Sequence, residues 1–338
     1  MESKRIEYLD AVKGFAMLLV VMAHTIGWNF LKWEDVVLFN IENPINVMNA
    51  GFIWQLIYSF HMALFFMISG YFLTVDYKCI NIIIKKSKRL LLPYFVTGFL
   101  LLIVRDYYGY WFLFSLWELS VIGAILNVIS KTVNKKSNLV YDIFIFISAY
   151  IVLRYLLKLP YFDNPICDIE KCTSYLLPFF LGMIMRKYEQ IRTILLNHLG
   201  IYIICFVFLF TWRYMPLLGV DKDGLIYRGG NYLANLFFLP IIGSIMIITI
   251  FKNGILKRFQ SFFSNIGKSS LEIYIFHLFF VFQIPQVGDF WLSTNLPTVI
   301  TSQLCYSLIV SLIAIAFSLM ISFALKKSKV LSKLFFGI

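Results

Sequence analysis

Residues 8–25 read YLDAVKGFAMLLVVMAHT. This run is apolar and long enough to enter a bilayer, yet it carries Lys13 near its start and His24 well inside it. Ionisable side chains inside a membrane-spanning helix are costly, and by default they mark function. The stretch therefore predicts an uncleaved first span of a helical membrane protein, and it raises the question of what chemistry needs a buried imidazole.

The composition of the whole chain supports a membrane protein. Of its 338 residues, 60% are hydrophobic and 14% are charged, whereas soluble domains carry about 25% charged residues. Apolar blocks of spanning length recur from end to end between short polar breaks. We expect an all-α fold, a polytopic integral membrane bundle of about ten helices that forms one domain over residues 1–338. The expected spans lie near 11–31, 52–75, 90–105, 111–130, 139–158, 174–187, 199–217, 232–251, 268–285 and 299–325.

The basic residues are distributed unevenly between the two sides of these spans. One set of alternating loops, together with the adjoining span ends and chain ends, holds 21 lysines and arginines, and the other set holds six. Positively charged loops stay on the cytoplasmic side, so we expect both termini to be cytoplasmic. The net charge of +12 is then a topology signal rather than a sign of nucleic-acid binding. It would also attract membrane lipids with anionic headgroups or an anionic cytosolic ligand.

The first span aligns its ionisable residues. Lys13 and His24 are 11 residues apart, which places them within roughly 20° on one helical face and about 16 Å apart along the axis. Asp10 lies three residues before Lys13 and shares that face. This stripe suits an elongated anionic ligand that enters from the cytoplasm. Alternatively, Lys13 is a topology anchor at the surface, and His24 binds a polar group of a neighbouring helix.

Two further buried groups are candidates for catalysis. His61, in FHMALFF, lies at a depth where it could meet His24, and two imidazoles around one cavity would make an acid–base pair. Glu118, in the span after YWFLFSLW, would find a cation, orient a histidine or stay protonated. Alternatively, each has only a structural role, as a core residue whose hydrogen bond is satisfied. Of Glu272 and His277, which are not well aligned on one helical face, we expect a structural role for Glu272 and leave His277 open.

Other motifs carry little signal. Cys167 and Cys172 share a loop expected to lie outside, where they either form a disulfide or remain thiols. No histidine lies near the pair, so we expect no metal site. A nucleotide-binding loop is also absent from the sequence.

Six motifs, in order, resemble the acyltransferase-3 family, in particular its sugar O-acetyltransferase branch, which is fucose 4-O-acetylase-like. They are RIEYLDAVKGFAMLLVVMAH, FHMALFFMISGYFL, KKSKRLLLPYF, YWFLFSLWELSVI, LPFFLGMIMRK and IGKSSLEIYIFHL, and they cover about residues 5–285. The family's first span carries an arginine, ten residues and a histidine. Here His24 matches and Lys13 takes the arginine position. Lys86 and Arg89 stand where the family has paired arginines, and His61 is similar to a histidine of that branch.

The resemblance implies an acyltransferase for groups other than aminoacyl groups, in the cytoplasmic membrane of a bacterium. An acyl group, usually acetyl from acetyl-CoA, would pass to a hydroxyl of a cell-surface or lipid-linked carbohydrate. The donor phosphates would meet Lys13, Lys86, Lys88 and Arg89. His24 would then act as general base or transient acyl carrier, while His61 or Glu118 orients it or stabilises the oxyanion.

Two other function classes compete with this one. A proton-coupled transporter or flippase for a glycan intermediate would also bury histidines, but the inverted repeats common in transporters are not detectable in the sequence. A membrane sensor or scaffold without chemistry would not need Lys13, His24 and His61 on neighbouring helices.

Overall fold

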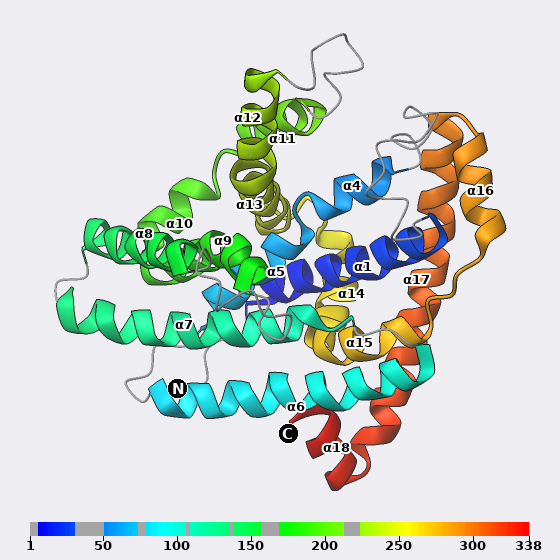
Figure 1. Ribbon diagram of the computed structural model, residues 1–338, viewed down its shortest axis with the longest axis horizontal. Coiled ribbons are helices and arrows are strands. Elements are labelled where there is room, and N and C mark those ends of the chain that lie inside the picture. The colour runs from blue at the N-terminus through cyan, green and yellow to red at the C-terminus, as the bar shows by residue number, and fades with distance from the viewer. Residues whose placement is uncertain are drawn as a thin grey trace. The chain divides into compact units, whose positions relative to one another are not determined.

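The computed structural model describes residues 6–30, 51–73, 79–105, 109–134, 138–156, 169–212 and 224–337 (Figure 1). Within these ranges every regular element is a helix and none is a strand, which confirms the all-α class. The chain forms two compact units. The first unit combines Met1–His61 with Leu256–Ser328, and the second combines Met62–Ile255 with Lys329–Ile338.

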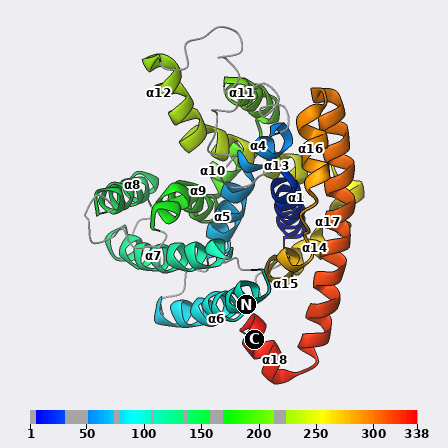
Figure 2. The ribbon, with the colours of Figure 1, turned by 45° about the vertical axis from the view of Figure 1, so that its right-hand side comes forward.

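The first unit is built around helix α1. Its elements are α1 (Glu7–Phe30), α4 (Phe52–Tyr58), α14 (Lys257–Lys268), α15 (Ser270–Phe276), the 3₁₀ helix η4 (His277–Phe279), α16 (Pro285–Ser293) and α17 (Leu296–Lys326). Helix α1 packs most extensively on α14 and also contacts α4, α15, α16 and α17 (Figure 2). Because the apolar face of α1 is surrounded by these partners, the residues along it are held in fixed positions.

Two glycines allow α1 and α14 to approach closely. A Cβ atom placed on Gly14 would lie 1.8 Å from the carbonyl oxygen of Phe263. A Cβ atom on Gly267 would lie 1.8 Å from the carbonyl oxygen of Asp10. Both distances are far below any real contact, so only glycine fits at this crossing. The contact fixes the end of α1 that carries Lys13.

The expected span over 268–285 is wrong as one continuous helix. The chain turns at Ser269, runs through α15, tightens into η4 at His277 and has no regular structure over residues 281–284. Pro285 then begins α16, and a proline favours a new helix start because it donates no backbone hydrogen bond. The run SLEIYIFHLFF before this segment contains neither proline nor glycine, so the sequence does not predict that the α-helix ends at Phe276.

The second unit holds the remaining helices. They are α5 (His61–Tyr71), α6 (Cys79–Arg105), α7 (Trp111–Val133), α8 (Leu139–Leu156), α9 (Ile169–Lys187), α10 (Glu189–Leu195), α11 (Leu199–Thr211), α12 (Leu225–Leu233), the π-helix η3 (Ala234–Phe238), α13 (Leu239–Lys252) and α18 (Lys329–Phe336). Helix α5 starts at His61, the last residue of the first unit. Helices α6, α7, α8 and α9 pack together, because α7 contacts α6, α8 and α9, and α8 contacts α9.

Helix α6 begins well before the expected third span over 90–105. The basic stretch around residues 80–90 and the expected third span form one helix, with Pro93 inside it. The C-terminal helix α18 packs against α6. Just after α18, Gly337 has a φ of +67°, and a Cβ atom there would lie 2.1 Å from the carbonyl oxygen of Lys88. The chain end is therefore seated directly on the basic part of α6.

Six helical segments among the described residues are long and apolar enough to cross a membrane. They are Glu7–Asn29, Phe52–Tyr71, Cys79–Arg105, Trp111–Val133, Leu225–Lys252 and Leu296–Lys326. A seventh results if α10 and α11, which are bent by 64° from each other, form one broken span. The chain is thus a multi-pass membrane protein, while the count of ten and the cytoplasmic termini remain predictions.

Candidate active site

His24 and His277 form the centre of the candidate site. The two ring centroids lie 5.2 Å apart, with an angle of 50° between the ring planes. His24 is half-buried on α1, whereas His277 is fully buried at the start of η4. Both residues belong to the first unit. The histidine on α1 therefore has an imidazole neighbour that the sequence left unassigned.

The surroundings of His277 determine which ring nitrogen carries its proton. Its Nδ1 lies 2.8 Å from the carbonyl oxygen of Tyr274 and 3.2 Å from that of Ile273. Carbonyl oxygens only accept hydrogen bonds, so Nδ1 is the N–H donor and Nε2 keeps a lone pair. Nε2 is buried and has no hydrogen-bond partner among the described residues. Burying a hydrogen-bond acceptor without a partner costs free energy. Here the acceptor is Nε2 of His277, on the ring next to His24.

His61 is oriented in the same way. Its Nδ1 donates to the carbonyl oxygen of Ile57, at 2.8 Å, so its Nε2 also keeps the lone pair. The ring is 2% exposed and packs edge-on against Tyr58, at 4.7 Å between centroids. Both His61 and His277 lie within range of an electrostatic interaction with His24. The half-buried imidazole of His24 thus has two buried imidazoles near it, those of His61 and His277. Both of these rings carry their proton on Nδ1, so Nε2 can accept a proton.

Lys13 lies near the other end of α1, paired with a carboxylate. Its Nζ is 2.6 Å from an oxygen of Asp10, one helical turn earlier. The side chain of Asp10 is 3% exposed and that of Lys13 is 24% exposed. The pair balances charge within the helix, and about a quarter of the Lys13 side chain remains exposed.

Asn29 shapes the backbone that follows His277. Its Nδ2 donates to the carbonyl oxygen of Phe282 at 3.3 Å, and its Oδ1 accepts from the backbone N–H of Ile284 at 2.5 Å. The Asn29 amide thus provides hydrogen-bond partners for one backbone carbonyl and one backbone N–H in the segment between η4 and α16, where the helix is interrupted. Asn29 is not among the residues predicted for the site, although an asparagine inside an apolar helix is itself a signal of a buried polar contact.

The second unit holds the other predicted site residues. Lys86 is half-buried on α6, and Lys88 and Arg89 are exposed on the same helix. Glu118 is half-buried on α7. Trp117 Nε1 donates to Ser87 Oγ at 2.8 Å, which ties the turn of α7 that carries Glu118 to the basic part of α6. The structure therefore places the three cations and Glu118 in the second unit, and Lys13, His24 and His61 in the first unit.

Two expectations concern cysteines and metals. Cys167 lies outside the described residues, so its pairing with Cys172 stays a prediction. Among the residues that the structure does describe, no group of three or more His, Cys, Asp or Glu side chains could hold a metal ion.

Comparison with known proteins assigns the chain to a family. The family model described as an acyltransferase domain matches residues 6–323, nearly the whole chain. Neither a curated protein nor a solved structure matches significantly. The match includes both units and every residue of the histidine cluster. The chain belongs to the acyltransferase-3 family and is an acyltransferase.

Proposed function

We propose that this protein transfers a short acyl group, acetyl in the first instance, from acyl-CoA on the cytoplasmic side to a hydroxyl group of a cell-surface or lipid-linked carbohydrate. The observation that carries the proposal is the contact between His24 and His277. It supports a role for His24 as general base, because a half-buried imidazole can reach a substrate while a buried partner fixes its orientation.

The reaction needs one proton to move twice. His24 takes the proton of the acceptor hydroxyl as its oxygen attacks the thioester carbonyl, and the new C–O bond forms. The C–S bond then breaks, and the CoA thiolate leaves with the proton from His24. During the step His24 is an imidazolium with an N–H on both nitrogens, and Nε2 of His277 is an acceptor for one of them. His61 Nε2 is a second acceptor within the cluster.

The donor is held through its phosphates. Acyl-CoA is polyanionic at one end, and Lys86, Lys88 and Arg89 supply three positive charges within about one turn of α6. Charge-assisted hydrogen bonds of this kind are about twice as strong as neutral ones. Lys13, whose side chain is 24% exposed beside Asp10, offers a further positive charge on α1 of the first unit.

A transporter or flippase for a glycan intermediate is the second candidate. The interrupted segment at α15, η4 and residues 281–284 favours it, because transporters bind substrate where helices are broken. In that role His24, His61 and His277 would carry protons across the membrane, and no acyl group would change partner.

The test is release of CoA from radiolabelled acetyl-CoA by the protein purified in detergent. Wild type should show slow turnover to water and faster turnover with a suitable carbohydrate, and His24→Ala should lose both. His198→Ala is the matched control, because His198 is exposed and precedes α11. Full turnover by a folded His24→Ala protein would rule out the base, and substrate movement without CoA release would favour the transporter.

A further inference from the structure

The C-terminal helix α18 lies against α6, and both helices belong to the second unit (Figure 2). Phe336, the last residue of α18, is 1% exposed. The backbone N–H of Gly337 donates to the carbonyl oxygen of Lys333 at 3.0 Å, so Gly337 follows Lys333 by one helical turn. A Cβ atom on Gly337 would lie 2.1 Å from the carbonyl oxygen of Lys88 and 2.9 Å from the Cα atom of Arg89. Lys333 therefore stands one turn from the point where the chain end touches the backbone of Lys88 and Arg89.

The contact at Gly337 fixes the position of α18 along α6. The φ of +67° lies in the left-handed region that glycine adopts without strain, and a glycine in this conformation is a common way to end a helix. Since the carbonyl oxygen of Lys88 leaves no room for a side chain, both the conformation and the close approach require glycine here. The end of α18 is therefore held at the same turn of α6 that carries the cations proposed to bind the donor.

Together the two helices carry six cations. They are Lys85, Lys86, Lys88 and Arg89 on α6, and Lys329 and Lys333 on α18. Five of them are exposed and Lys86 is half-buried, within range of electrostatic repulsion from Lys85 and Arg89. Among the residues that the structure describes, none of the six forms an ion pair with a carboxylate. Like charges gathered on one surface repel each other, so an anion that binds there relieves this repulsion.

Acyl-CoA has a distribution of charge that suits two adjoining helices. Its ribose carries a phosphomonoester, with a charge of about −1.5 to −2 at neutral pH, and a diphosphate joins the ribose to the pantetheine arm. Cations on α6 and α18 can therefore bind separate phosphate groups and need not converge on a single one. A phospholipid such as phosphatidylglycerol offers one singly charged phosphodiester, which would leave most of the six charges uncompensated.

We propose that α18 completes the donor site, with Lys329 and Lys333 binding phosphate groups of acyl-CoA beside the cations of α6. The inference rests on the proposed function, because it takes acyl-CoA as the donor. The two lysines hold the phosphate end of the donor and take no part in the proton transfer. Binding of this kind is equal in the ground state and in the transition state, so its loss raises KM and leaves kcat unchanged.

The test compares two donors with the full-length protein in detergent. Acetyl-CoA carries the phosphates, and S-acetylpantetheine carries the same thioester without them. Lys329→Gln/Lys333→Gln should raise the KM for acetyl-CoA about 25-fold, from about fivefold for each charge, and should leave the KM for S-acetylpantetheine unchanged. The matched control is Lys257→Gln/Arg258→Gln, which removes two charges from exposed positions on α14 and should change neither KM. If the double variant does not fold, Lys333→Gln alone should raise the KM for acetyl-CoA about fivefold.

Two outcomes would overturn the proposal. One is a KM for acetyl-CoA that is the same in the control and in the double variant, or in folded Lys333→Gln. Weaker binding of phosphatidylglycerol by that variant in native mass spectrometry would then identify a lipid headgroup as the anion bound by α18. The other is an equal rise of KM for both donors, which would indicate that α18 only supports the fold. Failure of the proposed function is distinct from both, because wild type would then neither bind nor turn over either donor.

Discussion

His24 on α1 and His277 at the start of η4 place their imidazole rings 5.2 Å apart, although they lie far apart in the sequence. The backbone carbonyl oxygens that contact His277 hold its proton on Nδ1, so its Nε2 is the nitrogen that can accept a hydrogen bond. His24, being half-buried, is the member that a substrate can approach. This relationship makes His277 a positioning residue in the proposed reaction rather than one that touches the acceptor.

Substitution of His277 should lower kcat without raising KM for the acyl donor. We expect His277→Ala to reduce kcat about 100-fold, at the low end of what a positioned acid–base group contributes. His277→Gln should recover part of this loss, because its side-chain oxygen can replace Nε2 as acceptor. The measurement is steady-state CoA release, with His198→Ala as the control. A loss that is equal in the alanine and glutamine variants would indicate packing rather than positioning.

Removal of the Asn29 side chain should destabilise the protein and also impair turnover. Asn29→Ala leaves the carbonyl of Phe282 and the N–H of Ile284 without these partners, which costs about 1–3 kcal/mol for each buried group. The segment that follows His277 then loses its anchor. Thermal unfolding in detergent should show a lower midpoint for Asn29→Ala than for Asn197→Ala, whose side chain is exposed. An unchanged midpoint would mean that the segment is held by other contacts.

Much of the fold follows from hydropathy, and the site follows only in part. The apolar runs predicted α1, α6, α7 and α17, because a span must satisfy its own backbone in lipid. The pairing of Asp10 with Lys13 followed from helical spacing alone. Glu272 forms an ion pair with Lys326, at 2.5 Å, in agreement with the structural role expected for it.

The partner of His24 could not be derived from spacing. The depth of His61 in the membrane, estimated by treating each span as a straight helix, predicted that His61 lies near His24. The interruption at His277 depends instead on Asn29, which reaches the broken segment from another helix. Such a break is a tertiary feature, and the run SLEIYIFHLFF carries no local sign of it.

The glycines at the crossing of α1 and α14 should tolerate no side chain. Gly14→Ala or Gly267→Ala would place a methyl group within 2 Å of a backbone carbonyl, so the helices must separate. We expect loss of the folded protein from detergent extracts, measured by size-exclusion chromatography. The control is Gly200→Ala on α11, where nothing lies within 4 Å; there the higher helix propensity of alanine should leave stability unchanged or raise it by about 1 kcal/mol. Normal behaviour of Gly14→Ala would refute the close crossing.

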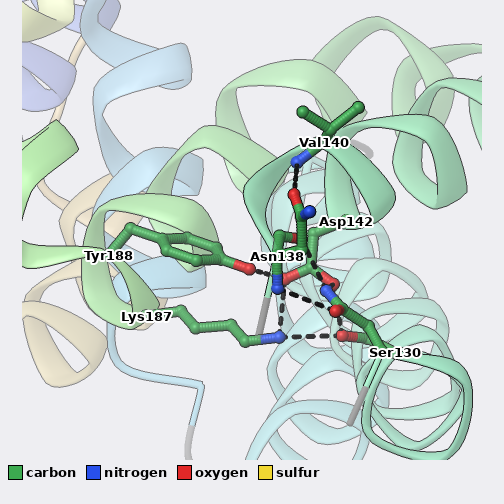
Figure 3. Close-up of polar contacts among 7 residues, drawn as sticks. Ser130, Asn138, Val140, Asp142, Lys187 and Tyr188 are labelled. Atoms are coloured by element: carbon green, nitrogen blue, oxygen red, sulfur yellow. Dashed lines mark hydrogen bonds and ion pairs between the residues drawn. The ribbon is translucent and has the colours of Figure 1, made fainter. Parts of the chain in front are cut away.

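The Asp142–Lys187 pair, with 2.6 Å between Lys187 Nζ and a carboxylate oxygen of Asp142 (Figure 3), should show strong energetic coupling, unlike an exposed pair of the same length. Asp142→Ala leaves a partly buried ammonium group facing Ser130 without its counter-ion, and we expect about 2–3 kcal/mol of destabilisation, less than the 3–5 kcal/mol of a fully buried pair. Lys187→Ala should cost a similar amount, and the double variant should cost clearly less than the sum. The control cycle uses Glu189 and Arg192, whose 2.5 Å contact includes a carboxylate that is 81% exposed, and its coupling should not exceed about 0.5 kcal/mol. If the two cycles give equal coupling energies, Asp142 is solvated in the protein rather than buried with Lys187.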